Sequence, residues 1–298
     1  MKRKVLAILL FLTLGHTLVQ AGQKIVAIQS VSIGPYDQAI KGFTSVGDFE
    51  IKRLVLSELR GMDIVKKIDE IGPDIVLTIG PDALLKAKSI QKTPVVYLMV
   101  LDPQSILSGE RNVTGVSMNI SPKQQLATLL QVLPDVENIG LLYDPAKTRE
   151  FVQRARVAAE KIGIRLYAKE VNRPSDIPSL ISDMKGKIDL FWMLPDVTVI
   201  TPETVKFLLL FSLENKIPVL TFSEKYVELG TPISIGIDAF DIGCQAGEMV
   251  KRILSGTDVK DVQPVDARKE VISISPKIAR KLGIRIDEKI IWKARIVN

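Results

Sequence analysis

One pattern recurs along this chain: a short apolar strand, a capped turn and then an amphipathic helix. In one such unit, Ser121 and Pro122 open a helix, apolar residues recur at helical spacing from Leu126 to Leu133, and Pro134 ends it. Alternation of strands and helices builds parallel sheets, which bind ligands beyond the carboxyl ends of their strands. The pattern therefore predicts an α/β fold with a binding site at those ends.

The length of 298 residues fits one large or two medium domains, each with a substantial core. The unit after Ile237 has no place as a third domain, so we expect it to return to the first one. The predicted strands cover residues 24–30, 49–56, 75–79, 94–100, 112–118, 139–143, 164–171, 188–194, 218–222, 233–237 and 269–274.

The start of the chain is typical of a bacterial export signal. A basic segment, Lys2 to Lys4, precedes an apolar run from Val5 to Leu14, and compact residues lead up to Ala21. The apolar run is shorter than the roughly 20 residues of a membrane-spanning helix. We predict a signal peptide over residues 1–21, cleavage near Ala21 and a soluble periplasmic protein. An uncleaved membrane anchor is the alternative.

Histidine and cysteine each occur once. His16 falls in the predicted signal, so the mature chain has no histidine. This excludes Ser-His-Asp and Cys-His catalysis and most zinc sites, and no clustered carboxylate motif is present. Cys244 has no cysteine to pair with, and we expect it to be a small buried side chain. We predict a protein that is not an enzyme and holds no metal or cofactor.

The charge distribution bears on the kind of partner. The formal net charge is +6, but the basic residues are scattered along the chain. Scattered charge is typical of a solvated surface, whereas a nucleic-acid-binding protein concentrates its basic residues in a patch or stripe. We therefore predict no nucleic-acid partner.

Short segments spread over nearly the whole mature chain carry a family resemblance. In chain order they are residues 73–80, Asp102-Pro103, 112–117, Leu133-Pro134, 140–145, Asp196 with Thr198-Val199, 217–219, 236–238, 243–247 and 279–284. Together they resemble the extracytoplasmic substrate-binding proteins of ABC transporters, a family that has tryptophan- and tyrosine-type importers among its members.

The resemblance implies the type I periplasmic-binding fold: two doubly wound parallel-sheet lobes, joined by three crossovers, that close on a ligand by hinge motion. Lobe one is expected to hold residues 22–117 and 239–298, and lobe two residues 118–238. The implied function is capture of a small polar ligand, such as an amino acid, for import. The implied partner is the membrane permease of the transporter, and we expect a monomer.

The chain also departs from the family pattern at the expected cleft. Gly80-Pro81-Asp82 stands where the family tends to have Gly-Thr-Pro, and Asp196-Val197-Thr198 stands in place of an Asp-Asn-Thr-like motif. The first helix, within residues 36–46, is shorter than usual. These departures support an alternative function, a sensor or interaction domain with a degenerate cleft and no role in transport.

Candidate ligand contacts are the polar and turn residues at the carboxyl ends of the strands in both lobes. They are Ser30, Ser32, Gly80, Pro81, Asp82, Asp102, Tyr143, Asp196, Ser223 and Asp238.

Several of these candidates have a purely structural alternative. A carboxylate at Asp196 would pair with a ligand ammonium, or would cap residues 197–200. The amides that open the helix from Ala83 favour an anion, unless Asp82 caps them. Asp238 contacts ligand or caps the helix from residue 241, and Tyr143 stacks on ligand or covers the hinge.

Overall fold

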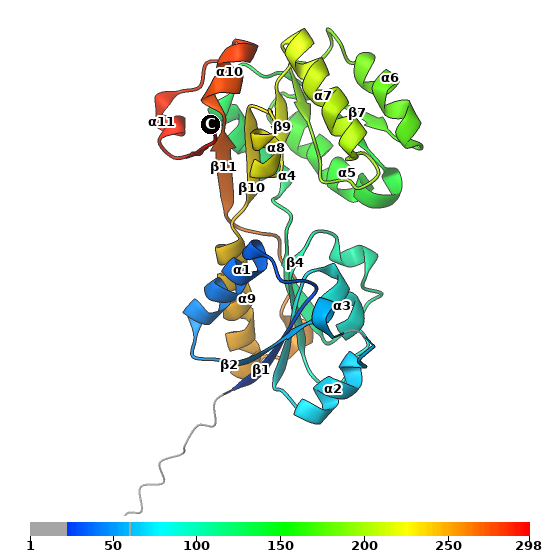
Figure 1. Cartoon of the computed structure of the whole chain (residues 1–298), viewed down its shortest axis with the longest axis vertical. Coiled ribbons are helices and arrows are strands. Elements are labelled where there is room, and N and C mark those ends of the chain that lie inside the picture. Colours follow the sequence, from blue (N-terminus) through cyan, green and yellow to red (C-terminus); the bar gives the residue numbers. More distant parts are fainter. Residues whose placement is uncertain (1–22, 60) are drawn as a thin grey trace, which may run out of the picture.

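The computed structural model describes residues 23–59 and 61–298 and has two α/β lobes, one above the other in Figure 1. The predicted fold class is confirmed. The predicted signal peptide, residues 1–21, lies outside the described residues. Within the described part of the chain, no helix has both the length and the apolar character needed to cross a membrane.

Lobe one, the lower lobe in Figure 1, is built on a five-stranded parallel sheet in the order β2-β1-β3-β4-β5. Helices α1 (Gly34–Val46) and α9 (Ala239–Leu254) cover one face, and α2 (Ile64–Ile71) and α3 (Pro81–Ala87) cover the other. Because both faces are covered, the inner strands are continuously buried. The strands are β1 (Lys24–Gln29), β2 (Glu50–Val55), β3 (Ile75–Ile79), β4 (Val95–Val100) and β5 (Val113–Ser117).

Two glycines let α1 and α9 approach at backbone distance. A Cβ added at Gly42 would lie 1.8 Å from the carbonyl oxygen of Phe240, and one added at Gly243 would lie 1.9 Å from that of Ala39. Cys244 lies at the same contact, half-buried instead of buried as expected, and its thiol donates to the carbonyl oxygen of Gly42. The contact fixes the returning helix α9 on lobe one.

Lobe two has a seven-stranded sheet in the order β12-β11-β10-β9-β8-β6-β7, in which only the β10–β11 pair is antiparallel. Helices α4 and α5 pack on one face, and α6 and α7 pack on the other. The strands are β6 (Asn138–Tyr143), β7 (Arg165–Glu170), β8 (Leu190–Trp192), β9 (Val219–Thr221), β10 (Ile233–Ile237), β11 (Glu270–Ile274) and β12 (Arg295–Ile296). The helices are α4 (Pro122–Val132), α5 (Pro145–Lys161), α6 (Ile177–Ser182), α7 (Pro202–Asn215), α8 (Glu224–Glu228), α10 (Pro276–Leu282) and α11 (Glu288–Ile291).

The end of the chain corrects the expected division into lobes. The sequence predicts that all of residues 239–298 belong to lobe one, but β11 and β12 belong to the sheet of lobe two. Strand β11 pairs with β10 in antiparallel register, with Ile237 opposite Glu270. The physical reason is that β10 would otherwise present an unpaired edge, which a returning strand covers.

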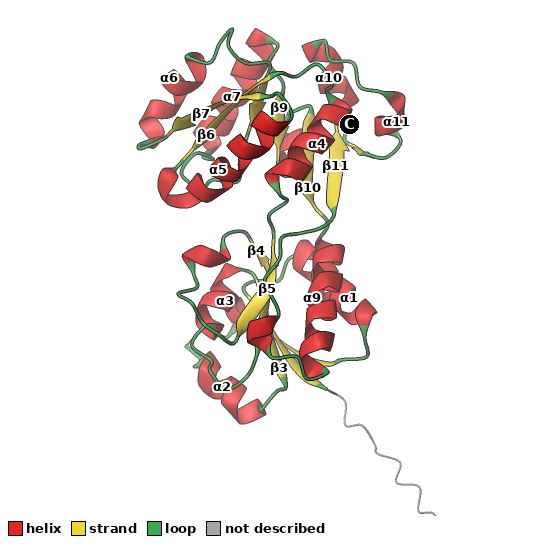
Figure 2. Cartoon of the chain, turned by 180° about the vertical axis from the view of Figure 1, so that it is seen from behind, coloured by secondary structure: helices red, strands yellow, loops and turns green. Residues whose placement is uncertain are grey.

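Three extended segments therefore pass between the lobes, and Figure 2 shows them side by side at the waist. The first joins β5 to α4 near residues 118–121, the second joins β10 to α9 at Asp238, and the third leads from lobe one to β11 through residues 265–269. The first and third run together, since the backbone N–H of Ser117 donates to Val265 and that of Ala267 donates to Asn119. Lobe closure therefore requires these segments to bend together.

Candidate ligand-binding cleft

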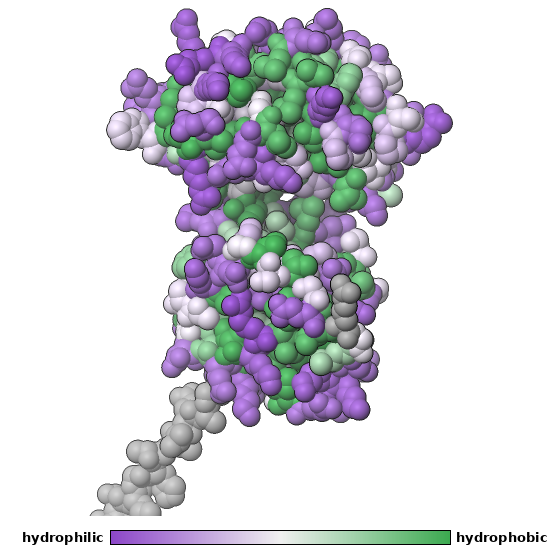
Figure 3. Space-filling view, viewed as in Figure 1, coloured by the Kyte–Doolittle hydropathy of each residue, from purple (hydrophilic) through white to green (hydrophobic). Residues whose placement is uncertain are grey.

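A cleft of about 690 Å³ lies between the lobes and is lined from both of them. This volume suits a small-molecule ligand. Figure 3 shows the narrow waist between the lobes, with hydrophobic residues within it.

The wall from lobe one combines aromatic residues with a strained turn. Tyr36 and Tyr97 line it, together with Met99 at the end of β4. Met99 has a φ of 57°, in the left-handed region, and the pairing of β4 with β5 shifts register there. Such a bulge re-aims the residues that follow. It turns the chain from Val100 to Asp102 along the cleft.

The wall from lobe two is formed by the first turns of α5 and the loop after β8. Phe151 packs edge-on against Trp192, with ring centroids 5.8 Å apart, and the guanidinium of Arg154 lies 6.0 Å from the centre of the Phe151 ring. Lys147 and Glu150 line the same side. This wall therefore offers an aromatic ring beside charges of both signs.

Of the ten candidate residues, Pro81, Asp102 and Asp196 line the cleft. Pro81 opens α3. Asp102 caps the short 3-10 helix Pro103–Ser105, where its carboxylate accepts from the backbone N–H of Ser105 at 3.2 Å. Asp102 remains half-exposed at the cleft.

Asp196 is 1% exposed, and its carboxylate is fully used inside lobe two. One oxygen accepts from the backbone N–H of Asp144 at 2.8 Å and from the hydroxyl of Thr148 at 2.7 Å. The other accepts from the backbone N–H groups of Thr198 at 3.0 Å and Val199 at 3.4 Å. The geometry favours the structural alternative, a cap that ties the loop after β8 to the start of α5.

The other candidates of lobe one do not line the cleft. Ser30 is buried, and its hydroxyl accepts from the backbone N–H of Ala83 at 3.0 Å, so it caps α3 in place of Asp82. Gly80 has a φ of 93°, and a Cβ there would lie 2.3 Å from the hydroxyl of Tyr36. Asp82 is exposed in the first turn of α3, and burial together with this carboxylate raises the pKa of Tyr36. Ser32 is exposed ahead of α1.

Tyr143, Ser223 and Asp238 also lie outside the cleft lining. The hydroxyl of Tyr143 donates to Glu170 at 3.0 Å, on the outer edge of the sheet. Ser223 precedes α8 without a side-chain capping bond. Asp238 caps α9 and forms an ion pair with Lys269 at 2.7 Å, so its place is on the hinge.

Two oppositely charged residues that face each other across the cleft are not at strand ends and were not among the candidates. Arg154 of α5 lies 3.3 Å from Asp266 of the third crossover, and the hydroxyl of Ser117 donates to the other oxygen of Asp266 at 2.6 Å. Burial and the nearby Asp266 carboxylate raise the pKa of Tyr97 to about 12. The sequence does carry a signal for Arg154. It follows Lys147 and Glu150 at helical spacing, so the three charged residues share a polar face of α5 next to its core face.

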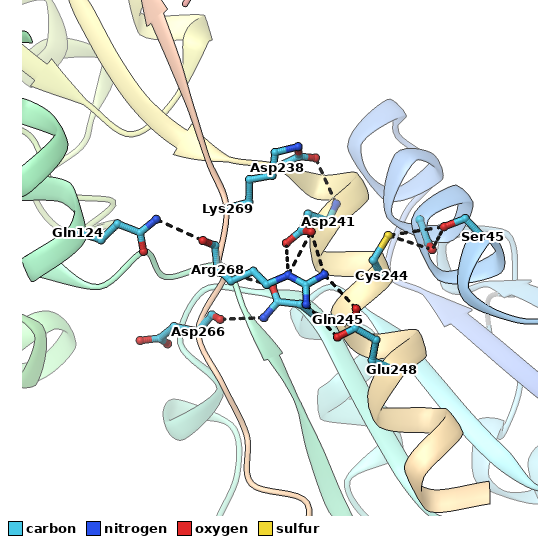
Figure 4. Close-up of polar contacts among 11 residues, drawn as sticks. Ser45, Gln124, Asp238, Asp241, Cys244, Gln245, Glu248, Asp266, Arg268 and Lys269 are labelled. Atoms are coloured by element: carbon cyan, nitrogen blue, oxygen red, sulfur yellow. Dashed lines mark hydrogen bonds and ion pairs between the residues drawn. The ribbon is translucent and has the colours of Figure 1, made fainter. Parts of the chain in front are cut away.

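The third crossover is clamped onto α9, as Figure 4 shows. The guanidinium of Arg268 bonds both carboxylate oxygens of Asp241 and both of Glu248, at 2.9–3.2 Å, and Glu248 and Asp241 raise the pKa of Arg268. Burial raises the pKa of Asp238, but the hydrogen bonds from Lys269 and from the backbone of Asp241 outweigh it, and that pKa lies below its usual value. The clamp makes residues 266–268 part of lobe one.

Glu270, at the start of β11, is a half-buried carboxylate next to this hinge. One oxygen accepts from the hydroxyl of Thr128, and the other is buried with no hydrogen-bond partner among the residues that the structure describes. Burial raises the pKa of Glu270. In the described chain, no group of three or more His, Cys, Asp or Glu side chains gathers in a way that could hold a metal ion.

Because the pKa of Glu270 is raised, we expect replacement of Glu270 by glutamine to increase thermal stability in a pH-dependent way. Stability due to this group is complete below the ordinary carboxyl pKa and falls as pH rises through the raised one. A Glu270→Gln protein should therefore melt about 1–2 °C higher than wild type at pH 7, and the gain should vanish near pH 4. Thermal unfolding across this range measures it. Glu160→Gln, at an exposed position of α5, is the control, and an equal gain at every pH would contradict the assignment.

Two α/β lobes with parallel or mostly parallel sheets, three crossovers and a cleft lined from both sides define the class of two-lobed periplasmic-binding proteins. Residues 57–298 match the model of the family described as ABC transporter substrate binding protein. The match covers most of the chain, which therefore belongs to this family, and the resemblance found in the sequence is confirmed.

Similar proteins point to the same class. The Tyrosine-binding protein of Clostridioides difficile (strain R20291) is 25% identical over 198 residues, which span 63% of this chain and 57% of that protein. An ABC domain from Streptococcus pneumonia, solved in complex with L-Trp, is 25% identical with a TM-score of 0.63, and the match covers 93% of this chain and 100% of that one.

The fold is also shared with a ligand-free, open structure of a substrate binding protein with adhesive properties from Clostridium difficile. Its TM-score is 0.73 at 22% identity, and the match covers 93% of this chain and 99% of that one.

Proposed function

We propose that the protein is the extracytoplasmic solute-binding component of an ABC transporter, which captures a small polar ligand and delivers it to a membrane permease. The observation that supports this most directly is the cleft of about 690 Å³ lined by both lobes. A ligand that contacts both walls binds the closed state more tightly than the open state, and so shifts the hinge equilibrium toward closure. Closure is then the signal that the permease reads.

The proposed ligand class is an amino acid. Its support is twofold: two similar proteins are named for tyrosine or found with L-Trp, and the cleft combines the rings of Tyr97 and Phe151 with charges of both signs. The protein is proposed to bind this ligand without chemical change. It works as a monomer in the periplasm, after removal of residues 1–21.

Thermal unfolding of the chain from Gly22 onward tests the function. A panel of the twenty amino acids, dipeptides, sugars and nucleosides is the probe set. At a hundred times its dissociation constant, a ligand adds about 2.7 kcal/mol of stability and should raise Tm by about 2–4 °C. We expect a selective shift from one or a few amino acids, and a Phe151→Ala variant should lose most of it.

A panel without any shift would overturn the transport proposal and favour the sensor with a degenerate cleft. A shift from sugars or nucleosides alone would keep solute capture and overturn the amino-acid assignment.

A further inference from the structure

One ion pair in the cleft joins the two lobes. Arg154 stands on α5 in lobe two, whereas Asp266 lies in the third crossover, on the opposite wall, and their side chains meet at 3.3 Å. The pair is therefore made by groups that move relative to each other whenever the hinge opens or closes.

Asp266 is held firmly on lobe one. The buried carboxamide of Gln245 accepts from the backbone N–H of Arg268 at 3.1 Å and donates to the carbonyl of Asp266 at 3.2 Å (Figure 4). The hydroxyl of Ser117 holds one oxygen of the carboxylate at 2.6 Å. The second oxygen is the one that faces Arg154.

The pair itself is exchangeable. The side chains of Arg154 and Asp266 are 44% and 32% exposed, and only one nitrogen of the guanidinium reaches the carboxylate. An ion pair this exposed contributes little to stability, because water solvates both partners well. A ligand that supplies one carboxylate and one ammonium can replace both halves of the pair without leaving either charge unpaired.

We propose that Arg154 and Asp266 are the charge-recognition residues of the cleft. Arg154 binds the carboxylate of a zwitterionic ligand, and the oxygen of Asp266 that faces Arg154 in this structure binds its ammonium. This inference rests on the proposed function and assigns the selectivity of the same cleft. Asp196, whose carboxylate is already fully hydrogen-bonded, takes no part in it.

The surroundings of the pair fit an α-amino acid with an apolar side chain. The ring of Phe151 lies beside the guanidinium of Arg154 and packs on Trp192, so it is fixed in place. Tyr97 and Met99 line the wall opposite α5. A ligand held by its two charged groups between these walls would place its side chain among these apolar groups.

The test measures binding by isothermal titration calorimetry. Three probes are used: an amino acid, its amide and its deaminated acid. The amino acid is the one that raises the Tm of the wild type most in the panel, and L-tryptophan and L-tyrosine are tried first. The amide lacks the carboxylate, and the deaminated acid lacks the ammonium. In the wild type, both analogues should bind at least about tenfold more weakly than the amino acid.

Two variants separate the roles. Arg154→Ala should weaken the amino acid about 10–100-fold but leave the amide almost unchanged, so that discrimination between the two collapses. Asp266→Asn keeps an acceptor for Ser117. It should weaken binding of the amino acid about 10–100-fold but leave binding of the deaminated acid almost unchanged. Arg149→Ala is the matched control, because Arg149 lies on the same helix as Arg154 but outside the cleft, where it pairs with Glu170 of β7 at 3.8 Å.

Each outcome decides the proposal. If Arg154→Ala weakens the amino acid and its amide equally, the pair is a closure contact and the inference is overturned. Equal binding of amino acid and analogues by the wild type overturns the inference alone and leaves solute capture standing. A wild type that binds no amino acid overturns both this inference and the amino-acid assignment.

Discussion

A Gly243→Ala protein should be less stable than wild type by about 3 kcal/mol or more. Alanine favours a helix interior over glycine by about 1 kcal/mol, so the substitution would be stabilising if the site had room. It has none, because the new Cβ would lie 1.9 Å from the carbonyl oxygen of Ala39 and 2.7 Å from the backbone nitrogen of Phe43. The obstacle is the backbone of α1, so relief requires the two helices to separate.

Urea unfolding measures the loss, and Gly247→Ala is its matched control. Gly247 lies one turn further along α9, where a Cβ would be 3.0 Å from the carbonyl oxygen of Phe43. A displacement of a few tenths of an ångström accommodates that contact, so we expect a loss below about 1 kcal/mol. If Gly243→Ala cost no more than Gly247→Ala, close helix approach would not be what fixes α9 on lobe one.

The same contact matters for the cleft. Helix α9 carries Asp241, Gln245 and Glu248, which hold the third crossover and with it Asp266. A shift of α9 away from α1 would move this clamp as well. The α1–α9 contact at the glycines is thus connected through α9 and its hydrogen bonds to Asp266 in the wall of the cleft.

Local features of the fold could be predicted from the sequence because their causes are local. The strand Ile75–Ile79 is an apolar run bounded by Gly72-Pro73 and Gly80, and the structure has it at the predicted residues. Strand Ile233–Ile237 likewise has its predicted bounds. Ser121 caps α4 with Pro122 at its first position, as the sequence indicates.

The placement of the last segment could not be predicted in the same way. A strand over residues 269–274 could be predicted, and the structure has one at Glu270–Ile274, but its partner could not be predicted. Which sheet a strand joins depends on a free edge elsewhere in the fold, here that of β10, and no local pattern records this. The wrong lobe assignment of residues 270–298 follows from that gap.

The same holds for the candidate cleft: the residues placed by local patterns could be predicted, and those brought together by the fold could not. Strand ends can be found from sequence, and Pro81, Asp102 and Asp196 do line the cleft. Arg154 and Asp266 are 112 positions apart, on a helix and in a crossover, and only the folded chain brings them together. For Asp196 the position could be predicted, but its bonding partners on α5 could not.

An Asp196→Ala protein should lose about 3 kcal/mol of stability, because the carboxylate is structural. Its removal would leave the backbone N–H of Asp144, the hydroxyl of Thr148 and the backbone N–H of Thr198 without their acceptor. Each group is partly or fully withdrawn from water, and an unsatisfied donor of this kind costs about 1–3 kcal/mol. The side chain of Thr198 also holds Asp144 at 2.6 Å, so the two loops would loosen together.

Urea unfolding of Asp196→Ala beside Asp102→Ala separates structure from ligand contact. Asp102 also caps a short helix, but it is half-exposed, and water can satisfy the freed N–H of Ser105, so we expect a loss of about 1 kcal/mol or less. The ligand-contact hypothesis for Asp196 makes the opposite forecast, a protein of wild-type stability that no longer responds to any amino acid. Unchanged unfolding together with lost binding would restore that hypothesis, since a carboxylate with no structural duty is free to meet a ligand ammonium.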